Sequence, residues 1–197
     1  MKNVLIINGH QKYEGIAEGK LTQTIIDNIK SELSCDDFII EETYIDIGYE
    51  VDSEVEKFKK ADYIIFQYPV YWMSVPWITK KYMDEVFSAG AGTVTYINDG
   101  RSRSDTSKKY GSGGLMSDKK YMLSLTYNCP ESEFDNVDGF FDGLSLDEAN
   151  YAVHKVFQFC GAKQLKSYAM HDIFKSDLDI DRELKKLNII LKENFKG

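Results

Sequence analysis

The chain has 197 residues, of which 43 % are hydrophobic, so it can bury a core without disulfides or a structural metal. We therefore expect one domain spanning residues 1–197. The formal net charge of −8 argues against nonspecific nucleic-acid binding, which needs a basic surface. No segment approaches the roughly 20 consecutive apolar residues that span a bilayer, and residues 1–8 look like a strand rather than a signal peptide. These features predict a soluble cytoplasmic protein.

Predicted strands and helices alternate along the chain. Runs of apolar residues predict strands at 2–8, 37–43, 63–68 and 120–126, with a weaker fifth strand at 164–169. Helical spacing and helix-start signals predict helices at 21–33, from Asp52 or Ser53 onward, from Pro76 to Phe87, at 149–159 and at 179–194. This order predicts a doubly wound α/β domain with helices on both faces of a parallel sheet. In such sheets, ligands bind beyond the carboxyl ends of the strands.

The loop at residues 9–24 leads from the first strand into a helix. The free amides of a helix start attract anions, and Gly15 and Gly19 let the backbone approach a ligand closely, so a phosphate site is predicted. Neither a Rossmann nor a P-loop motif is present. The alternative is a long connection with a capped helix. His10 either faces the phosphates or is simply exposed.

Two further loops follow predicted strands. In residues 69–76, Tyr71 and Trp72 offer flat surfaces beside a ring system, although Trp72 and Trp77 could instead pack against the next helix. In residues 126–130, hydroxyl, amide and backbone groups could reach the same ligand. The three cysteines, Cys35, Cys129 and Cys160, are odd in number and lack CxxC spacing, so neither a disulfide framework nor a metal site is predicted.

Several motifs together resemble one family. They are Leu5-Ile-Ile-Asn-Gly9, Pro69-Val-Tyr-Trp-Met73, Pro76-Trp77, Lys80-Lys81-Tyr82, Asp99-Gly-Arg-Ser-Arg103, Lys108-Lys-Tyr-Gly-Ser-Gly-Gly-Leu115 and Lys119-Lys-Tyr-Met-Leu-Ser-Leu-Thr126. Over nearly its whole length the chain is similar to modulator of drug activity B, the bacterial NADPH:quinone reductase family. It departs at Cys129, an alanine in other members, and at Asp142, a histidine there. Residues 131–146, which would shape the acceptor pocket, resemble the family least.

The resemblance implies a flavodoxin-like fold, with a five-stranded parallel sheet in the order 2-1-3-4-5. It implies a homodimer that holds FAD, rather than FMN, at the subunit interface and passes hydride from NADPH to quinones in a ping-pong cycle. The pyrophosphate and ribityl region would contact Ala17, Glu18, Gly19, Lys20, Leu21, Thr22, Gln23 and Thr24. The isoalloxazine would lie beside Pro69, Val70, Tyr71, Trp72, Thr126, Tyr127, Asn128 and Cys129, with Tyr110 as a further FAD contact.

Several roles have more than one candidate. A proton for the quinone could come from Tyr127, Tyr110 or His154, or from solvent, although a lone helical histidine such as His154 more often packs. Three roles are open for the cations Arg101, Arg103, Lys108 and Lys109. They belong to a solvated loop, they bind an NADPH phosphate, or they dock a second subunit. Other hypotheses are an azo- or nitro-compound reductase and a flavodoxin-type electron carrier, because fold alone does not separate these functions.

Overall fold

The computed structural model describes residues 1–34, 38–175 and 177–195. Its central sheet is parallel and runs in the order β2-β1-β3-β4-β5, with β6 also paired to β4. The strands are β1 Lys2–Asn8, β2 Phe38–Tyr44, β3 Tyr63–Pro69, β4 Lys120–Thr126, β5 Lys163–Gln164 and β6 Tyr168–Met170. The predicted doubly wound flavodoxin-like fold and its strand order are therefore confirmed. Cys35 and the predicted strand start at Asp37 lie outside the described residues.

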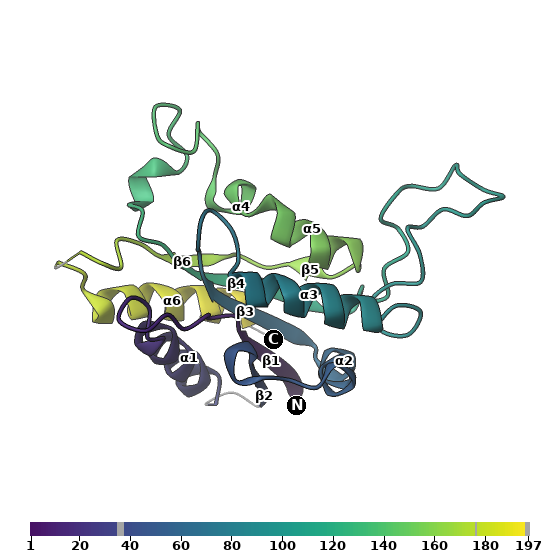
Figure 1. The fold of residues 1–197 in the computed structure, drawn as a ribbon, viewed down its shortest axis with the longest axis horizontal. Helices are drawn as coiled ribbons and strands as arrows, with labels where there is room; N and C mark the ends of the chain where they lie inside the picture. The colour runs from purple at the N-terminus through teal and green to yellow at the C-terminus, as the bar shows by residue number, and fades with distance from the viewer. Residues whose placement is uncertain (35–37, 176, 196–197) are drawn as a thin grey trace.

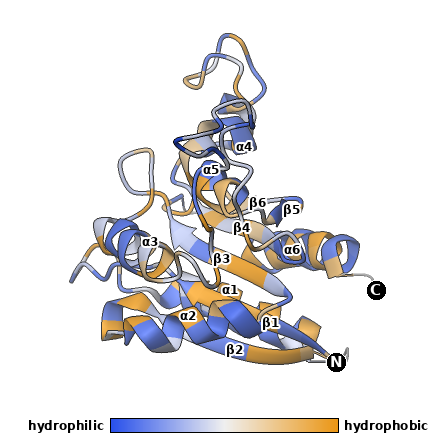
Figure 2. Cartoon of the chain, turned by 90° about the vertical axis from the view of Figure 1, so that its right-hand side faces the viewer, coloured by the Kyte–Doolittle hydropathy of each residue, from blue (hydrophilic) through white to orange (hydrophobic). Residues whose placement is uncertain are grey.

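Helices cover both faces of the sheet (Figure 1). They are α1 Lys20–Leu33, α2 Val51–Lys60, α3 Trp77–Ala89, α4 Leu146–Ala149, α5 Tyr151–Phe159 and α6 Ile180–Phe195, with short 3-10 turns at Ile45–Ile47 and Glu131–Glu133. One core lies between the sheet and α1 and α6, and a second lies between the sheet and α2, α3 and α5. The apolar sides of the helices face the strands (Figure 2). Among the described helices, none is both long and apolar enough to cross a bilayer.

The prediction of one fifth strand at 164–169 is wrong, because two short strands stand there. Strand β5 pairs with Lys120 and Tyr121, whereas β6 pairs with the far end of β4. Between them, the side chain of Asn194 in α6 bonds both backbone groups of Lys166, at 3.2 Å from its N–H and 2.9 Å from its carbonyl. At Lys166 the Asn194 side chain therefore takes the place of a neighbouring strand as hydrogen-bond partner. Strand pairing with β4 is interrupted between β5 and β6.

Two predicted helix starts also differ from the structure. Helix α2 begins at Val51 after Glu50, which has extended backbone, so Asp52 and Ser53 lie inside its first turn instead of capping it. The helix predicted from Ala149 is divided into α4 and α5 at Asn150, because the Asn150 side chain bonds two buried tyrosines of the core. Pro76 directly precedes α3 and occupies its N-cap position.

Two loops project from the body, one from the end of its long axis at the right of Figure 1 and one from its upper edge. The first, residues 97–113, we call the arm; the second, residues 131–144, we call the flap. The two sides of the arm meet at a bridge between Tyr96 and Gly114. They lie so close together that a Cβ on Gly113 would be 2.1 Å from the carbonyl oxygen of Asn98. Glycine at this position therefore allows the arm to form.

A buried carboxylate joins β2, α2 and α3. Glu54 accepts hydrogen bonds from the Thr43 hydroxyl at 2.6 Å, from the Tyr82 hydroxyl at 2.7 Å and from the Lys57 ammonium at 2.7 Å. Burial, and then the nearby Glu54 charge, raise the pKa of Tyr82 well above its ordinary value, so this phenol stays a donor. A buried charge needs such partners to offset its lost hydration.

Tyr82→Phe removes one donor from this buried carboxylate. We expect the free energy of unfolding to fall by about 1.5–3 kcal/mol, which is typical of a hydrogen bond to a charged group. Chemical denaturation followed by circular dichroism measures it. Tyr151→Phe is the control, since the Tyr151 side chain is exposed and its change should stay within about 0.5 kcal/mol. Equal free energies of unfolding for the two variants would show that the hydrogen bond from Tyr82 to Glu54 does not stabilise the fold.

Candidate functional site

Three loops meet at the carboxyl edge of the sheet, as the sequence predicts. A cavity of about 250 Å³ lies between the loops after β1, β3 and β4 and the segment after β6. Of the predicted cofactor residues, ten line it: His10, Ala17, Glu18, Gly19, Lys20, Leu21, Thr22, Pro69, Tyr71 and Thr126. Ile16, Ile173 and Phe174 line it as well and were not predicted, because nothing in their local sequence distinguishes them.

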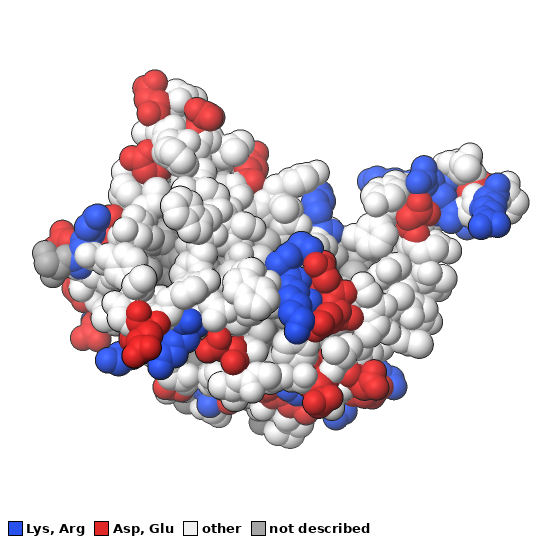
Figure 3. Space-filling view, viewed as in Figure 1, with Lys and Arg blue, Asp and Glu red and all other residues white. Residues whose placement is uncertain are grey.

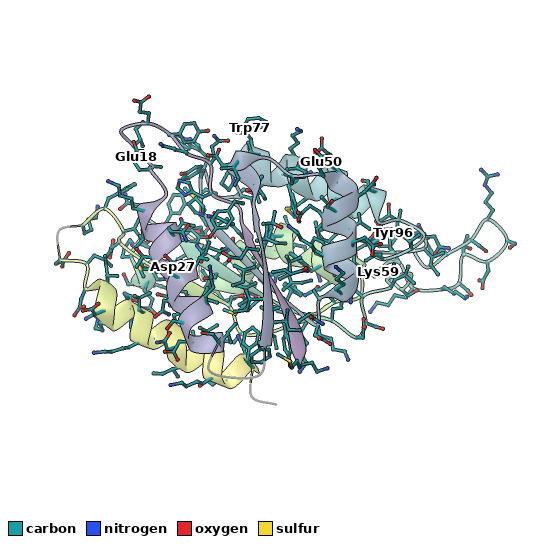
Figure 4. The ribbon with its side chains drawn as sticks, turned by 90° about the horizontal axis from the view of Figure 1, so that it is seen from below. Glu18, Asp27, Glu50, Lys59, Trp77 and Tyr96 are labelled. Atoms are coloured by element: carbon teal, nitrogen blue, oxygen red, sulfur yellow. The ribbon has the colours of Figure 1, made fainter. Side chains whose placement is uncertain are left out.

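The N-terminus of α1 forms one wall of this cavity. Gly19 at its N-cap position has a φ of +81°, and no side chain caps the helix. The first-turn amides and the positive end of the helix dipole therefore remain available to an anion. Glu18 of this loop and Trp77 at the start of α3 lie toward the same edge, away from Tyr96 near the arm (Figure 4). The predicted phosphate site falls here, and phosphate binding stays a prediction.

His10 holds the loop against α1. Its Nε2 lies 3.1 Å from the carbonyl oxygen of Ala17, and its Nδ1 lies 3.2 Å from the Thr22 hydroxyl. A carbonyl can only accept, so Nε2 carries the hydrogen and Nδ1 accepts from Thr22. The ring lines the cavity, but both of its nitrogens already have protein partners. Contact of His10 with cofactor phosphates thus stays a prediction, and its visible role is to shape the loop.

Polar side chains without partners occur near the carboxyl ends of β3 and β4. Gln67 is completely buried, and both atoms of its amide lack a hydrogen bond, as does the Ser124 hydroxyl beside it in the sheet. By strand alternation they face α1 and α6, two residues before Pro69 and Thr126. Buried polar atoms normally have a partner, in the protein, in water or in a ligand. Neither side chain is among the residues that line the cavity.

The loop after β3 is a tight turn. Tyr71 and Ser74 exchange two backbone hydrogen bonds, and the two residues between them have positive φ, 49° at Trp72 and 65° at Met73. Such backbone is strained for residues other than glycine and is concentrated at functional sites. The Tyr71 ring lines the cavity, and its hydroxyl donates a hydrogen bond to the Gln11 carbonyl at 3.0 Å. The Trp72 side chain, in contrast, is 97 % exposed. Contact of Trp72 and Val70 with a flavin stays a prediction.

The loop after β4 turns its aromatic ring inward. Tyr127 is 4 % exposed, and its hydroxyl accepts a hydrogen bond from the Asn150 amide at 2.9 Å. Burial raises its pKa to about 12, so the phenol is protonated at neutral pH. His171 stacks parallel to this ring, with 5.9 Å between centroids. Of this loop, Thr126 alone lines the cavity; Asn128 and Cys129 lie just beyond it in sequence.

The structure separates the three candidate proton donors. His154 is buried in α5, with Nδ1 2.9 Å from the Tyr121 hydroxyl and Nε2 3.2 Å from Asp147. Tyr110 stands on the arm, 5.6 Å from the Phe159 ring and under the Arg101 guanidinium. It borders another cavity, of about 630 Å³, whose walls contain none of the three loops. Neither residue lines the three-loop cavity, and no cluster of metal-binding side chains occurs in the described chain.

His171 is a residue that sequence reasoning missed. Its Nδ1 lies 3.0 Å from the carbonyl oxygen of Cys129, so it donates there and ties β6 to the loop after β4. Burial lowers the pKa of this imidazole. No local motif marks it, because the contact joins segments 42 residues apart.

Comparison with known proteins agrees with this geometry. The family model described as a flavodoxin-like fold matches residues 2–190. The chain belongs to this family. It is 38 % identical over 174 residues to the NADPH:quinone oxidoreductase MdaB of Haemophilus influenzae, covering 88 % of this chain and 90 % of that one. The resemblance to modulator of drug activity B is thereby confirmed.

Two other proteins show how widely this fold occurs. An uncharacterized protein of Schizosaccharomyces pombe is 41 % identical over 173 residues, covering 88 % of this chain and 87 % of that one. The structure of general stress protein 14 from Treponema denticola, in complex with FMN, superposes with a TM-score of 0.66. It covers 98 % of this chain and 97 % of that one at 15 % identity, a likeness of fold alone.

His171→Asn tests the attachment of the loop after β4. A histidine with a lowered pKa in the folded state binds its proton more readily when unfolded, so it destabilises the protein as pH falls below about 6.5. We expect the variant to lose less stability than wild type between about pH 7.5 and about pH 5.5. Chemical denaturation at both pH values measures this. Parallel losses in the two proteins would contradict it.

Proposed function

We propose that the chain is a flavin-dependent NAD(P)H:quinone oxidoreductase. The observation that carries this proposal is the cavity between three loops at the uncapped start of α1. A quinone oxidoreductase is 38 % identical to the chain over 174 residues, which supports the proposal. FAD, a ping-pong cycle, NADPH as hydride donor and a cytoplasmic location are parts of the same proposal.

The residues present fit a flavin in one orientation. The first-turn amides of α1 would bind its phosphates, and Lys20 adds a positive charge at that helix start. Tyr71 and Thr126 would lie beside the ring system, where the two strands end in register at Pro69 and Thr126. When bound, the flavin supplies a hydride acceptor for the nicotinamide and a hydride donor for the quinone. In the proposed ping-pong cycle the two substrates bind in turn beside this flavin.

Tyr127 is the best placed of the three candidate donors. The Asn150 amide donates to its oxygen, and the Asn150 carbonyl oxygen already accepts from Tyr68 at 3.1 Å. The hydroxyl proton of Tyr127 consequently has no acceptor among the described residues. Tyr127 directly follows Thr126, which lines the cavity. His154 instead has both nitrogens engaged with Tyr121 and Asp147. We assign Tyr127 the donation of a proton to the reduced acceptor.

Tyr110 points to a second copy of the chain. It lies on the arm, which extends away from the α1 loop of its own chain (Figure 1). It cannot line the three-loop cavity of that chain, so the proposed FAD contact requires the arm of a partner. A symmetric dimer, the commonest closed assembly, supplies two such arms.

Anaerobic addition of stoichiometric NADPH to flavin-loaded protein tests the main proposal. We expect rapid bleaching of the flavin absorbance, followed by full recovery when menadione is added. The measurement is stopped-flow absorbance, with NADH run in parallel. Absence of bleaching with either nucleotide would rule out the reductase and favour an electron carrier.

Tyr127→Phe tests the proton donor. We expect reoxidation by menadione to slow about a hundredfold, the lower limit for general acid catalysis, while bleaching by NADPH stays within about twofold of wild type. Tyr151→Phe changes an exposed phenol on α5 and is the matched control. Equal slowing of both half-reactions would indicate a structural role for Tyr127, and unchanged reoxidation would indicate that solvent supplies the proton.

A further inference from the structure

Asn150 is a buried polar residue that directs all of its side-chain hydrogen bonds into the core. The residue is 4 % exposed. Its amide oxygen accepts from the Tyr68 hydroxyl at 3.1 Å. Its amide nitrogen donates to the Leu146 carbonyl and to the Tyr127 hydroxyl, both at 2.9 Å. A side-chain amide has two N–H donors, so both are used.

The Leu146 carbonyl fixes which way round this amide lies. A backbone carbonyl can only accept a hydrogen bond. With the amide turned over, the Asn150 oxygen would face the Leu146 oxygen, and two acceptors repel each other. The nitrogen therefore faces Leu146, and its second hydrogen is directed at the oxygen of Tyr127. In this contact Tyr127 is the acceptor and not the donor.

The break between α4 and α5 allows the Asn150 side chain to reach these partners. Asn150 has φ −105° and ψ 20°, and it ends α4 and precedes α5. This region of backbone space is sparsely populated and is common among active-site residues. The amide joins Tyr68 of β3 to Tyr127 in the loop after β4, which are 82 and 23 residues away in sequence. One side chain thus links two of the three loop-bearing strands.

The ring of Tyr127 is held on several sides. His171 stacks on it at an interplanar angle of 16°, and Phe134 and Phe141 meet it at 75° and 87°. The hydroxyl hydrogen is then the main freedom left, and the O–H of a phenol prefers the plane of its ring on either side of the C–O bond. Because Asn150 donates from one side, the hydrogen lies on the other. Burial raises the pKa of Tyr127 to about 12, so this hydrogen is present at neutral pH.

No described residue accepts this hydrogen. The nearest group of carboxylates belongs to the flap, where the side chains at positions 131, 135, 138 and 142 are exposed. Acidic side chains are visible on the outer surface of the flap at the upper left of Figure 3. Tyr127 itself is 4 % exposed. A buried donor without a partner is unfavourable in the absence of a ligand, so the geometry leaves this hydrogen for a bound molecule.

We infer that Asn150 is the positioning residue for proton transfer from Tyr127. It turns the hydroxyl hydrogen away from the core and toward the acceptor, and it keeps its bond to the phenolate oxygen after the proton has left. The inference rests on the proposed function, in which Tyr127 protonates the reduced acceptor. Solvent returns the proton to Tyr127 after the product leaves.

The hydrogen bond from Asn150 favours the transition state over the resting state. Hydrogen bonds to ionised groups are roughly twice as strong as those between neutral groups. The bond therefore strengthens as negative charge develops on the Tyr127 oxygen. Only interactions that are stronger in the transition state accelerate the chemical step. Asn150 consequently acts on the rate without touching the acceptor.

Asn150→Asp tests this role, because it replaces the N–H donor with an oxygen of nearly the same size. The carboxylate accepts the Tyr127 hydrogen and opposes charge on the phenolate. We expect reoxidation of the flavin by menadione to slow about a hundredfold, as on loss of a general acid. Bleaching by NADPH should stay within about twofold of wild type, since that half-reaction takes no proton from Tyr127. Stopped-flow absorbance of flavin-loaded protein measures both steps.

A spectroscopic measurement reports the hydroxyl direction without any substrate. Flavin-loaded protein is labelled with carbon-13 at Cζ of its 13 tyrosines, and the signal missing from Tyr127→Phe identifies Tyr127. We expect this signal to move downfield in Asn150→Asp, because the phenol changes from acceptor to donor toward a carboxylate. The shift does not depend on turnover, so it separates the direction of the hydroxyl from the activity.

Tyr68→Phe is the matched control. It removes the other buried tyrosine bond of the same amide, while Leu146 still holds the nitrogen toward Tyr127. We expect some loss of stability, but reoxidation within about twofold of wild type and an unmoved Tyr127 signal. Asn150→Ala serves if the buried charge of Asn150→Asp prevents folding. It removes the donor without adding an acceptor, and we expect reoxidation to slow about tenfold, the rate equivalent of one hydrogen bond.

Three outcomes would overturn the inference. They are an unmoved Tyr127 signal in Asn150→Asp, equal slowing of reoxidation by Tyr68→Phe and the Asn150 variants, and equal slowing of both half-reactions by the Asn150 variants. Failure of wild type to bleach with either nucleotide would instead refute the proposed function. The carbon-13 signal would then still decide whether Asn150 sets the direction of the Tyr127 hydroxyl.

Discussion

The site depends on the register in which three parallel strands end. Asn8 of β1 pairs with Gln67 of β3, and Gln67 pairs with Ser124 of β4, so three loops start side by side at one edge. The first loop then lies close against α3. A Cβ on Gly9 would be 2.8 Å from the Thr79 hydroxyl, which donates to the Gly9 carbonyl at 2.6 Å. This contact and the bonds of His10 direct the chain to the start of α1.

This edge is built from groups that lower stability in the absence of a ligand. The Gln67 amide and the Ser124 hydroxyl are buried without partners, the turn at Trp72 and Met73 has positive φ, and α1 begins uncapped. Each feature is unfavourable in a chain selected for stability alone. Together at one cavity they are typical of a binding site, where stability is commonly sacrificed for function.

The two faces of the sheet contribute differently to function. The α1 and α6 side holds the uncapped start of α1 and the buried polar atoms of Gln67 and Ser124, whereas the α3 and α5 side holds Tyr127, Asn150 and His154. A ligand at the carboxyl edge can contact both. The flap follows the carboxyl end of β4 and lies beside this edge, whereas the arm connects α3 to the amino end of β4 at the opposite edge.

The sequence by itself determined the first four strands to within about one residue, the strand order through the family resemblance, and the three loops that form the cavity. Strands β1 and β4 agree with their predicted bounds residue by residue, since long apolar runs are a strong local signal. The anion site was predicted from a local pattern of the same kind, a loop that leads from a buried strand into an amphipathic helix, and anion binding there stays a prediction.

The tertiary structure alone decided the long-range contacts. Asn194 interrupts the fifth strand, Asn150 divides a helix, and His171 attaches the loop after β4, each by bonding a residue distant in sequence. The sequence likewise could not show that both ring nitrogens of His154 form hydrogen bonds, with Tyr121 and Asp147. Nor could it show that Tyr110 lies away from the three-loop cavity of its own chain. Hydrophobic period and loop composition describe neighbours along the chain, whereas hydrogen-bond partners depend on which segments packing brings together.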